Sequence, residues 1–328
     1  MQPLPTQRSA QRRAHNRARG RARPHPRVRA RPILPGASYK VTKRCFERRL
    51  FLAPGHQPEV LRNFIGYCLA YAANRYGIEV HAAIVMSNHY HIDLTDPLAE
   101  LVPFKQLFNS LVARGLNALR GRFDSFWSGD GACDTRRIEG DDGLGDLVYT
   151  LTNPVSAGLV KWSRQWPGFT TADWRFGERR SFRRPDWFFD ESGHMPETAE
   201  LILVRPRVLE DLDDDDLYER LTAGIREAER AVQAELRANG RRFMGLRKLA
   251  KQGWRQVPKS FEERFRVTPR VAASSKWLRL AQLQRDRAWE RAYAVARELW
   301  LAGEPAEFPI GTYWLRRFAG VVVASAPP

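Results

Sequence analysis

The sequence is poor in cysteine and contains no long apolar run. Its 328 residues include Cys45, Cys68 and Cys133, which are far apart and form no CxxC pair. An odd number of widely spaced cysteines indicates neither a disulfide framework nor a zinc knuckle. No apolar run reaches the about 18 residues of a membrane span, and the N-terminus lacks the apolar core of a secretory signal. We therefore expect a protein of a reducing compartment with no membrane partner.

Acidic residues are absent from the first 36 positions. Residues 1–36 contain ten arginines and six prolines, and they supply +10 of the formal charge of +17. Such a segment cannot bury apolar area, so we predict a disordered basic arm. Three roles stay open: a poorly constrained tail, an electrostatic arm that holds nucleic acid without reading its sequence, or an Arg-rich transit peptide. The charge of the whole chain favours a polyanionic partner, with nucleic acid ahead of a membrane surface.

Residues 37–185 have the pattern of one α+β domain. The predicted elements are a strand at 39–46, a helix from 60 that ends at Gly77, strands at 78–86 and 89–94, a helix at 103–120, a strand within 123–138, and a helix at 144–151. These assignments follow from apolar periods of 3.6 and 2 residues. The first six elements have the order β-α-β-β-α-β, which predicts a ferredoxin-like antiparallel sheet with helices on one face.

Residues 186–328 differ in composition from the preceding segment. Long stretches rich in Arg, Glu, Ala and Leu predict amphipathic helices at 215–238, 242–253 and 278–303. We expect a mostly helical C-terminal extension, whose role stays open between a DNA-binding addition, a lid and a dimerisation element. The sequence leaves monomer and homodimer equally possible.

Two histidines on one predicted strand are the first candidate site. They occur in "MSNHYHIDL", residues 86–94. Because side chains of a strand alternate between its faces, His89, His91 and Asp93 point one way, whereas Tyr90 points the other way, toward the helices. Two imidazoles at that spacing can share a divalent ion but leave coordination positions open. A chance pair of surface histidines is the alternative.

A tyrosine and an asparagine one helical turn apart are the second candidate site. Tyr149 and Asn153 lie in "YTLTNPVSAGLV" and fall on one helix face, off the apolar side of the helix. An amide oxygen can complete a metal site while a phenol faces a metal-bound phosphate. The alternatives are a half-buried aromatic side chain at Tyr149 and a helix N-cap at Asn153, before Pro154.

The two motifs together resemble a known family. "VHAAIVMSNHYHIDLTDP", then "YTLTNPVSAGLV", then "WPGFTT" is similar to the one-tyrosine HUH transposases, in particular to the REP-associated tyrosine transposase-like proteins, over residues 37–180. The resemblance implies a ferredoxin-like HUH domain in which His89 and His91 bind the metal and Tyr149 is the nucleophile. It also implies that Asn153 supplies the third protein ligand, although some relatives have Gln there. Asp93 is a candidate for orienting a histidine or assisting the tyrosine as a base.

The resemblance implies a metal-dependent single-strand DNA endonuclease and strand transferase. Mg²⁺ or Mn²⁺ is the expected cofactor, and the expected intermediate is a 5′-phosphotyrosine on Tyr149. The expected partner is single-stranded DNA with a hairpin, and the expected location is the cytoplasm, in association with the bacterial nucleoid. Basic side chains in the predicted domain are candidates for DNA contacts. They are Lys43, Arg44, Lys105, Arg114, Arg136, Arg137, Arg179, Arg180, Arg183 and Arg184.

Three other functions fit parts of the pattern. A domesticated DNA-binding regulator would have the same fold without catalysis, which the joint presence of His89, His91 and Tyr149 disfavours. An HUH replication initiator or relaxase-type nickase would share the chemistry, but the sequence has no GxxxxGK[ST] motif of a helicase. An RNA-binding ferredoxin-like domain with a structural metal would have an aromatic RNP-type strand, and no such run is present.

Overall fold

The computed structural model describes residues 30–129, 133–138, 143–190, 193–259, 269–273 and 275–325. Most of the predicted basic arm, residues 1–29, lies outside these residues. The described end of the arm is attached to the body, because the backbone N–H of Ile33 donates to the carbonyl of Gly311 at 3.0 Å. The prediction of disorder for the arm therefore stays a prediction.

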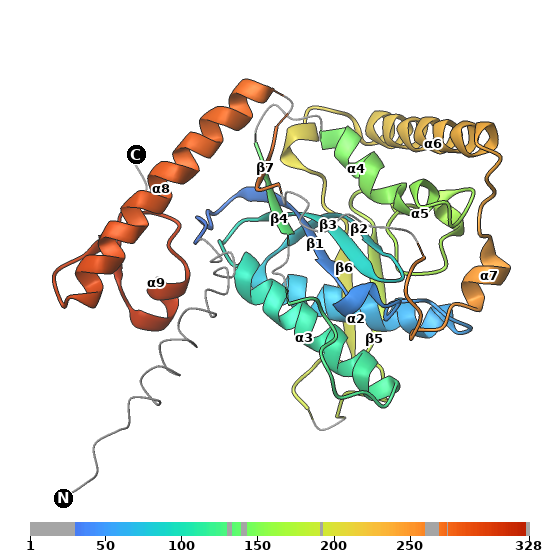
Figure 1. Cartoon of the computed structure of the whole chain (residues 1–328), viewed down its shortest axis with the longest axis horizontal. Helices are drawn as coiled ribbons and strands as arrows, with labels where there is room; N and C mark the ends of the chain where they lie inside the picture. Colours follow the sequence, from blue (N-terminus) through green and yellow to red (C-terminus); the bar gives the residue numbers. More distant parts are fainter. Residues whose placement is uncertain are drawn as a thin grey trace, which may run out of the picture.

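A five-stranded sheet with strand order β2-β3-β1-β4-β7 lies at the centre of the molecule (Figure 1). Its strands are β1 (Ala37–Arg44), β2 (Glu79–Val85), β3 (His89–Asp96), β4 (Cys133–Arg137) and β7 (Val271–Ala272). β3 pairs antiparallel with β1 and β2, and β4 pairs antiparallel with β1. β7 pairs parallel with β4. The predicted α+β class is confirmed, and the sheet is mostly antiparallel; β7, from a region predicted to be helical, adds a parallel edge.

Helices α2 (Pro58–Tyr76) and α3 (Leu101–Leu119) cover one face of the sheet. Pro58 opens α2 at its first position, and Gly77 ends it in the left-handed conformation at φ 63°. Tyr90 points to this face, where its ring lies edge-on to Phe108 at 5.3 Å between centroids and its hydroxyl donates to the Asn109 side chain. The predicted direction of Tyr90, toward the helices, is confirmed.

The opposite face carries α4 (Gly143–Leu151), α5 (Asn153–Ser156) and α6 (Asp214–Ala238). Leu147 and Leu151 of α4 pack between Ala82 on β2 and the buried leucines of α6. Helices therefore cover both faces, which corrects the prediction of helices on one face (Figure 1). The helix α4 was predicted from its apolar side. That apolar side indicated that the helix packs against the rest of the protein, but not which face of the sheet it covers.

A hairpin of β5 (Arg179–Arg183) and β6 (Thr198–Ile202) packs on α2. The Phe182 ring lies against Gly66, where a Cβ atom would come within 2.2 Å of it. Leu201 of β6 belongs to the same apolar cluster as the residues of α2 and α3. The predicted domain boundary at residues 185 and 186 therefore falls between two paired strands.

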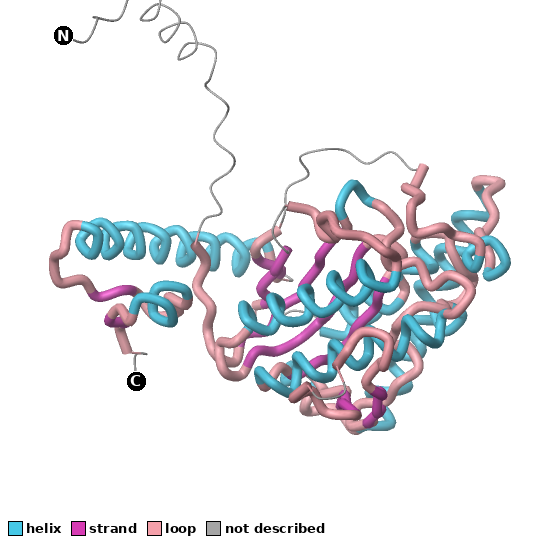
Figure 2. Tube along the Cα trace, turned by 90° about the horizontal axis from the view of Figure 1, so that it is seen from below, coloured by secondary structure: helices cyan, strands magenta, loops and turns pink. Residues whose placement is uncertain are grey.

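The remaining elements are short, apart from one long helix. They are the 3₁₀ turns η1 (Phe46–Arg48), η2 (Ser163–Gln165) and η3 (Arg207–Leu209), with α7 (Leu246–Ala250), α8 (Lys276–Leu301), β8 (Glu307–Phe308), α9 (Trp314–Ala319) and β9 (Val322–Val323). α8 and α9 lie to one side of the sheet, away from α5 and α7 (Figures 1 and 2). Among the described helices, none is long and apolar enough to cross a membrane.

Candidate functional site

His89 and His91 lie side by side at the start of β3, on the face that carries α4. Their ring centroids are 4.8 Å apart and the rings are nearly perpendicular. His89 Nδ1 is 2.8 Å from the amide oxygen of Asn88, and His91 Nδ1 is 2.8 Å from the Thr42 hydroxyl. Because an amide oxygen only accepts, His89 carries its proton on Nδ1. In His89, Nε2 is then the nitrogen that would ligate a metal, and in His91 Nδ1 is engaged with Thr42, whose hydroxyl can donate or accept.

Burial keeps His91 in the neutral form that binds metals. The residue is only 9% exposed. This burial lowers the pKa of His91 well below its usual range, and the neighbouring His89, Lys40 and Arg44 lower it further. A neutral imidazole is the form that ligates divalent ions. The burial of His91 is compatible with the ligand assignment, which stays a prediction.

Tyr149 projects from α4 above the histidine pair. Its ring centroid is 6.2 Å from that of His91, and the residue is 57% exposed although the helix on which it lies is packed against the sheet. Leu147 and Leu151 hold the other side of α4 in the core. The structure thus brings together two motifs that are 58 residues apart in the sequence. The phenol is accessible to a macromolecular substrate, as attack on a phosphodiester requires.

Asn153 begins α5, one turn beyond Tyr149. Its side-chain amide is 3.5 Å from the backbone oxygen of Tyr149, and the residue is partly exposed. Thr152, not Asn153, occupies the N-cap position of α5, and no side-chain hydrogen bond caps that helix. The alternative of a capping Asn153 is therefore not seen. Within the part of the chain that the structure describes, no group of three or more His, Cys, Asp or Glu side chains could hold a metal.

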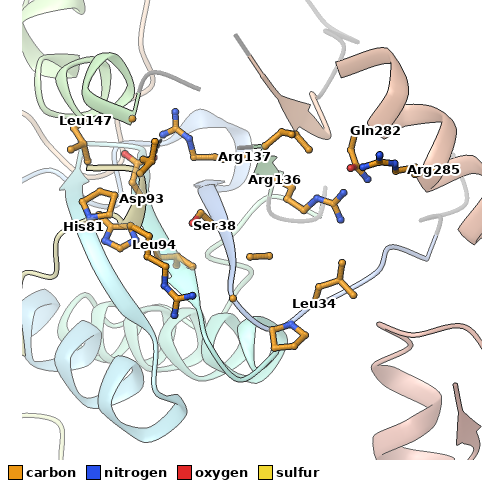
Figure 3. A pocket seen from close by; sticks show the side chains of 18 residues that line it. Leu34, Ser38, His81, Asp93, Leu94, Arg136, Arg137, Leu147, Gln282 and Arg285 are labelled. Carbon is orange, nitrogen blue, oxygen red and sulfur yellow. Dashed lines mark ion pairs between the residues drawn. The ribbon is translucent and has the colours of Figure 1, made fainter. Parts of the chain in front are cut away.

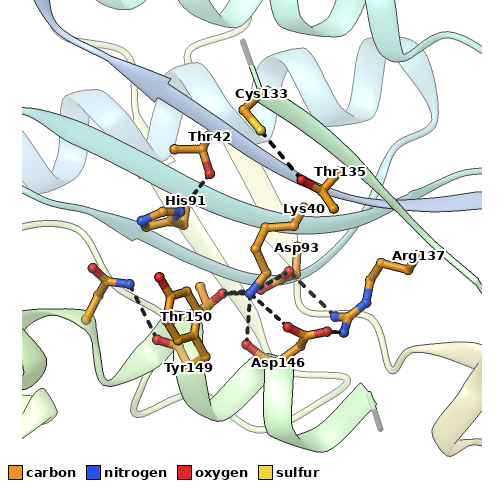
Figure 4. Close-up of polar contacts among 11 residues, drawn as sticks. Lys40, Thr42, His91, Asp93, Cys133, Thr135, Arg137, Asp146, Tyr149 and Thr150 are labelled. Carbon is orange, nitrogen blue, oxygen red and sulfur yellow. Dashed lines mark hydrogen bonds and ion pairs between the residues drawn. The ribbon is translucent and has the colours of Figure 1, made fainter. Parts of the chain in front are cut away.

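A polar network of largely buried side chains lies beside Tyr149, between the sheet and α4 (Figure 4). Lys40 of β1 places its ammonium 4.7 Å from the centroid of the Tyr149 ring and donates to the Thr150 hydroxyl at 2.8 Å. The ammonium is also 3.5 Å from an Asp93 oxygen and 3.3 Å from an Asp146 oxygen. Thr150 donates to the other oxygen of Asp93. One lysine therefore connects the sheet to the helix that presents the tyrosine.

The charges of this network are held out of water. Burial lowers the pKa of Lys40 and raises the pKa of Asp93, while the attraction between the two opposes both shifts. Asp93 is 2% exposed, and Arg137, itself paired with Asp146, lies 3.9 Å from it. Asp93 thus contacts Lys40 and Thr150 directly. Its predicted role as a base or as a partner of a histidine stays a prediction.

Lys40 was missed by the sequence reasoning. It lies opposite Asp93 in the antiparallel register of β1 and β3, and Thr42 lies opposite His91. Alternation along β1 would place both side chains on one face. Which face that is follows only from the register with β3, and the sequence does not reveal this register.

A cavity of about 470 Å³ adjoins the network between the sheet and α8 (Figure 3). His81, Asp93 and Leu147 lie at one end and Gln282 and Arg285 at the other, as the close-up shows. Arg136 and Arg137 line it as well, but they pair with Asp286 at 3.4 Å and with Asp146. These two predicted DNA contacts are therefore largely neutralised.

The other predicted DNA contacts are spread over both faces. Arg44 is exposed at the end of β1, opposite His89, and Lys43 donates to the Ser128 carbonyl at 2.8 Å. Lys105 and Arg114 lie on α3, where Lys105 pairs with Asp134. Of the ten candidates, Arg44 is thus placed beside the histidine pair.

The arginines of the hairpin lie away from Tyr149. Arg179 and Arg183 are exposed on β5, Arg180 pairs with Glu178 at 2.7 Å, and Arg184 donates to the Met195 carbonyl. The hairpin packs on α2, on the face of the sheet opposite α4. Contact of these arginines with DNA stays a prediction, and such contact would be remote from the tyrosine.

Comparisons with known proteins find little similarity in sequence. No family model matches the chain, and no curated protein matches it. Among solved structures, the chain is similar to a REP-associated tyrosine transposase bound to a REP hairpin, with 17% identity and a TM-score of 0.36. That match covers 43% of this chain and 80% of the other.

Proposed function

We propose that the chain is a metal-dependent single-strand DNA endonuclease and strand transferase of the one-tyrosine HUH type. One observation carries the proposal: an exposed tyrosine ring lies 6.2 Å from a buried, neutral histidine that belongs to an HxH pair. If Tyr149 had only a structural role, its ring would be expected to be buried. If the two histidines were a chance pair, their rings would be expected to be exposed. The arrangement instead presents a nucleophile beside two nitrogen ligands.

The topology of the sheet supports the finer assignment of the fold. The first four strands have the order β2-β3-β1-β4, and α2 and α3 both lie on the face opposite the histidines. This combination is what a ferredoxin-like β-α-β-β-α-β unit requires. We assign β7 and the helices α4 to α6 as additions to that unit. The additions leave His89 and His91 on the central strand β3, next to α4.

The residues of the site fit a divalent metal such as Mg²⁺ or Mn²⁺. His89 and His91 would hold it through Nε2, and Asn153 would contribute its amide oxygen. His89 Nδ1 donates to the Asn88 oxygen, and His91 Nδ1 shares a hydrogen bond with the Thr42 hydroxyl, so both rings are held in place. A bound metal would polarise the scissile phosphate and neutralise charge that develops on its oxygens.

The protein residues perform the transesterification. The Tyr149 phenol releases its proton to solvent as its oxygen attacks phosphorus, the bond from phosphorus to the 3′ oxygen breaks, and the leaving 3′ oxygen takes up a proton from solvent, so that no net proton is gained or lost. The products are a 5′-phosphotyrosine and a free 3′-OH, and the reverse reaction rejoins strands without a nucleotide cofactor. Lys40, whose ammonium lies 4.7 Å from the ring centroid, orients the phenol and stabilises negative charge on its oxygen.

Covalent capture of DNA is the test of this function. The wild-type chain is incubated with a single-stranded hairpin DNA and Mg²⁺ or Mn²⁺, and then separated by denaturing electrophoresis. We expect a covalent band that requires the metal and disappears in Tyr149→Phe and in His91→Ala. Tyr149→Phe should still bind the DNA, because the substitution removes only the nucleophilic hydroxyl.

Two outcomes would contradict the proposal. An adduct formed by Tyr149→Phe would exclude Tyr149 as the nucleophile. Binding of hairpin DNA by the wild-type chain without any adduct, at every metal tested, would indicate a DNA-binding regulator with the same fold. Tyr76→Phe is the matched control, because this tyrosine ends α2 on the other face and should leave the adduct unchanged.

A further inference from the structure

The loop that follows β1 has an unusual backbone. Glu47 and Arg48 are consecutive non-glycine residues in the left-handed conformation, at φ 50° and 59°. Each such residue costs on the order of 1 kcal/mol, and it persists only where surrounding contacts enforce it. The side chain of Asn88 donates to the Arg48 carbonyl at 3.2 Å, and Cys45 N–H donates to the Asn88 carbonyl at 2.8 Å. The loop is thus tied to the turn that immediately precedes His89.

The strained loop presents an aromatic ring next to a layer of arginines and other rings. Phe46 is 40% exposed. Beside it, the guanidinium of Arg122 lies 3.8 Å from the centroid of the Phe51 ring, and that of Arg255 lies 4.7 Å from the Trp254 ring. The ring centroids of Phe51 and Trp254 are 6.2 Å apart. Phe46, Arg49, Arg122, Trp254 and Arg255 together line a hollow of about 470 Å³, which we call the Phe46 surface.

The charge of this surface is positive. Arg49, Arg122 and Arg255 line the hollow, against Glu47 and Asp124. Arg49 is paired with Glu47 at 3.2 Å, whereas Arg255 is exposed. The exposed ring of Phe46 and the guanidinium plane of Arg255 on the partly buried Trp254 can each stack with the face of an unpaired base. Bases in a duplex already stack on one another and cannot use such a surface.

We propose that the Phe46 surface binds unpaired nucleobases of single-stranded DNA next to the histidine pair. Bases stack on Phe46 and on the Arg255–Trp254 pair, and the guanidinium groups face the phosphates. Asn88 and Cys45 connect this subsite directly to the turn before His89. That this subsite contacts the substrate of the enzyme rests on the proposed function. Binding of single-stranded DNA to the subsite can be measured without any catalysis.

The test uses the full-length Tyr149→Phe chain, which cannot form the expected adduct. Fluorescence anisotropy measures its affinity for a labelled single strand of about 12 nucleotides, which spans one binding site. The matching duplex and an RNA of the same sequence are measured too, each at several salt concentrations. Phe46→Ala and Arg255→Ala are introduced into this background, and thermal unfolding by circular dichroism checks the fold. Phe318→Ala and Arg287→Ala are matched controls, because both residues are exposed on the α8–α9 side of the molecule.

The two variants should have different signatures. Phe46→Ala should weaken binding of the single strand about 10-fold, the size of one lost stacking contact, without changing the salt dependence. Arg255→Ala should reduce the slope of log affinity against log salt by about 0.7, the value for one phosphate contact. Duplex affinity should be unaffected by Phe46→Ala, and both controls should behave like the parent chain. RNA should depend on Phe46 as DNA does, because stacking does not involve the sugar.

Unchanged single-strand affinity in Phe46→Ala would overturn the inference, as would an equal loss of duplex binding. Failure of the inference is separable from failure of the proposed function. If the wild-type chain never forms an adduct but single-strand binding depends on Phe46, the subsite stands and the nuclease assignment falls. If an adduct forms on Tyr149 while Phe46→Ala binds normally, the nuclease stands and the subsite falls.

Discussion

Lys40 is buried between the sheet and the tyrosine helix, although a lysine on a strand is ordinarily a surface residue. Its ammonium contacts Asp93, Asp146 and Thr150 and lies 4.7 Å from the Tyr149 ring. Replacement by the uncharged, similarly long Met should slow covalent capture of hairpin DNA by about 10-fold or more, because the positive charge beside the phenol is lost. Single-turnover electrophoresis at saturating DNA measures the rate, and anisotropy should show an unchanged dissociation constant.

Loss of stability is the competing explanation for a slow Lys40→Met variant. Removing Lys40 leaves the buried Asp93 charge with only Thr150 and the more distant Arg137, and the loss of one partner of a buried ion pair costs about 3 kcal/mol. The double variant Lys40→Met, Asp93→Asn removes both charges and should recover most of the unfolding free energy. We expect the rate to remain low in the double variant. Recovery of the rate together with stability would show that Lys40 has only a structural role.

His81 is a second buried polar residue, and its hydrogen bonds can be assigned completely. Nδ1 is 2.8 Å from the Val204 carbonyl, which only accepts, so Nδ1 carries the proton. Nε2 therefore accepts from the Thr95 hydroxyl at 2.8 Å, and Thr95 in turn accepts from Ser38 at 2.7 Å. Burial lowers the pKa of His81 to about 4, and Arg137 and Arg207 contribute to this shift. The neutral ring thus links β1, β3, β2 and the segment after β6.

Stability should decrease on acidification because of His81. Above pH 6.5 the ring is neutral in both the folded and the unfolded chain, and it adds no pH dependence. Between pH 6.5 and 4 only the unfolded chain binds the proton, so this residue reduces the unfolding free energy by about 1.4 kcal/mol per pH unit. His81→Gln should lack this part of the slope. Urea unfolding from pH 4 to 8 measures both chains, and equal slopes would refute the assignment.

At the scale of elements, α2 is enclosed by the sheet on one side and by the β5–β6 hairpin on the other. Gly66 makes this close approach possible, because the Phe182 ring occupies the space of a Cβ atom. Gly66→Ala should therefore destabilise the protein by about 1–3 kcal/mol despite the better helix propensity of Ala. Phe182→Leu in the same chain should recover part of the loss. Denaturant unfolding measures the wild type and both variants.

Gly129→Ala is the matched control for the substitution at Gly66. No atom lies within 4 Å of the position that its Cβ would occupy, so its unfolding free energy should stay close to that of the wild type. A neutral Gly66→Ala would mean that the hairpin is not packed on α2 as described. The arginines of β5 would then have to be reconsidered as possible contacts near Tyr149.

The elements predicted from periodicity were largely right. The helix predicted at 103–120 is α3 (Leu101–Leu119), the one at 215–238 is α6 (Asp214–Ala238), and that at 278–303 is α8 (Lys276–Leu301). Each has an apolar stripe at helical spacing, which the sequence shows without knowledge of tertiary contacts. The same rule predicted that His91 and Tyr90 point to opposite faces of β3, and the structure confirms it.

Features that depend on pairing between distant segments could not be predicted. β7 has only two residues, and it is a strand because it pairs with the edge strand β4. The face covered by α4 depends on the contact of Leu147 with α6, more than 60 residues away. The role of Lys40 depends on its register with Asp93. No local pattern encodes these contacts, so the candidate site was predicted without the lysine beside its tyrosine.

At the scale of the whole molecule, the positive charge is unevenly distributed along the chain. Residues 1–36 carry +10 of the net +17, whereas the described body contains many arginines already paired with carboxylates. A run of positive charge without acidic residues is expected to bind phosphates of any sequence and to release counterions on binding. We therefore expect the N-terminal segment to provide most of the general attraction for polyanions. The reaction itself is expected to depend on Tyr149 of α4.

Removal of residues 1–29 tests this separation. The truncation stops at residue 30, because Arg31 donates to the Asp134 carbonyl at 3.1 Å and Ile33 to that of Gly311, so the body keeps both contacts. The shortened chain should bind every single-stranded DNA more weakly, and the slope of log affinity against log salt should fall by about 0.7 for each lost phosphate contact. At saturating DNA the rate of covalent capture should be unchanged, since Lys40, His91 and Tyr149 remain.

A chain of the same length in which the arginines of residues 1–29 are replaced by Gln is the matched control, and it should reproduce the truncation. If capture at saturation slows as well, residues 1–29 act in the chemical step and not only in attraction.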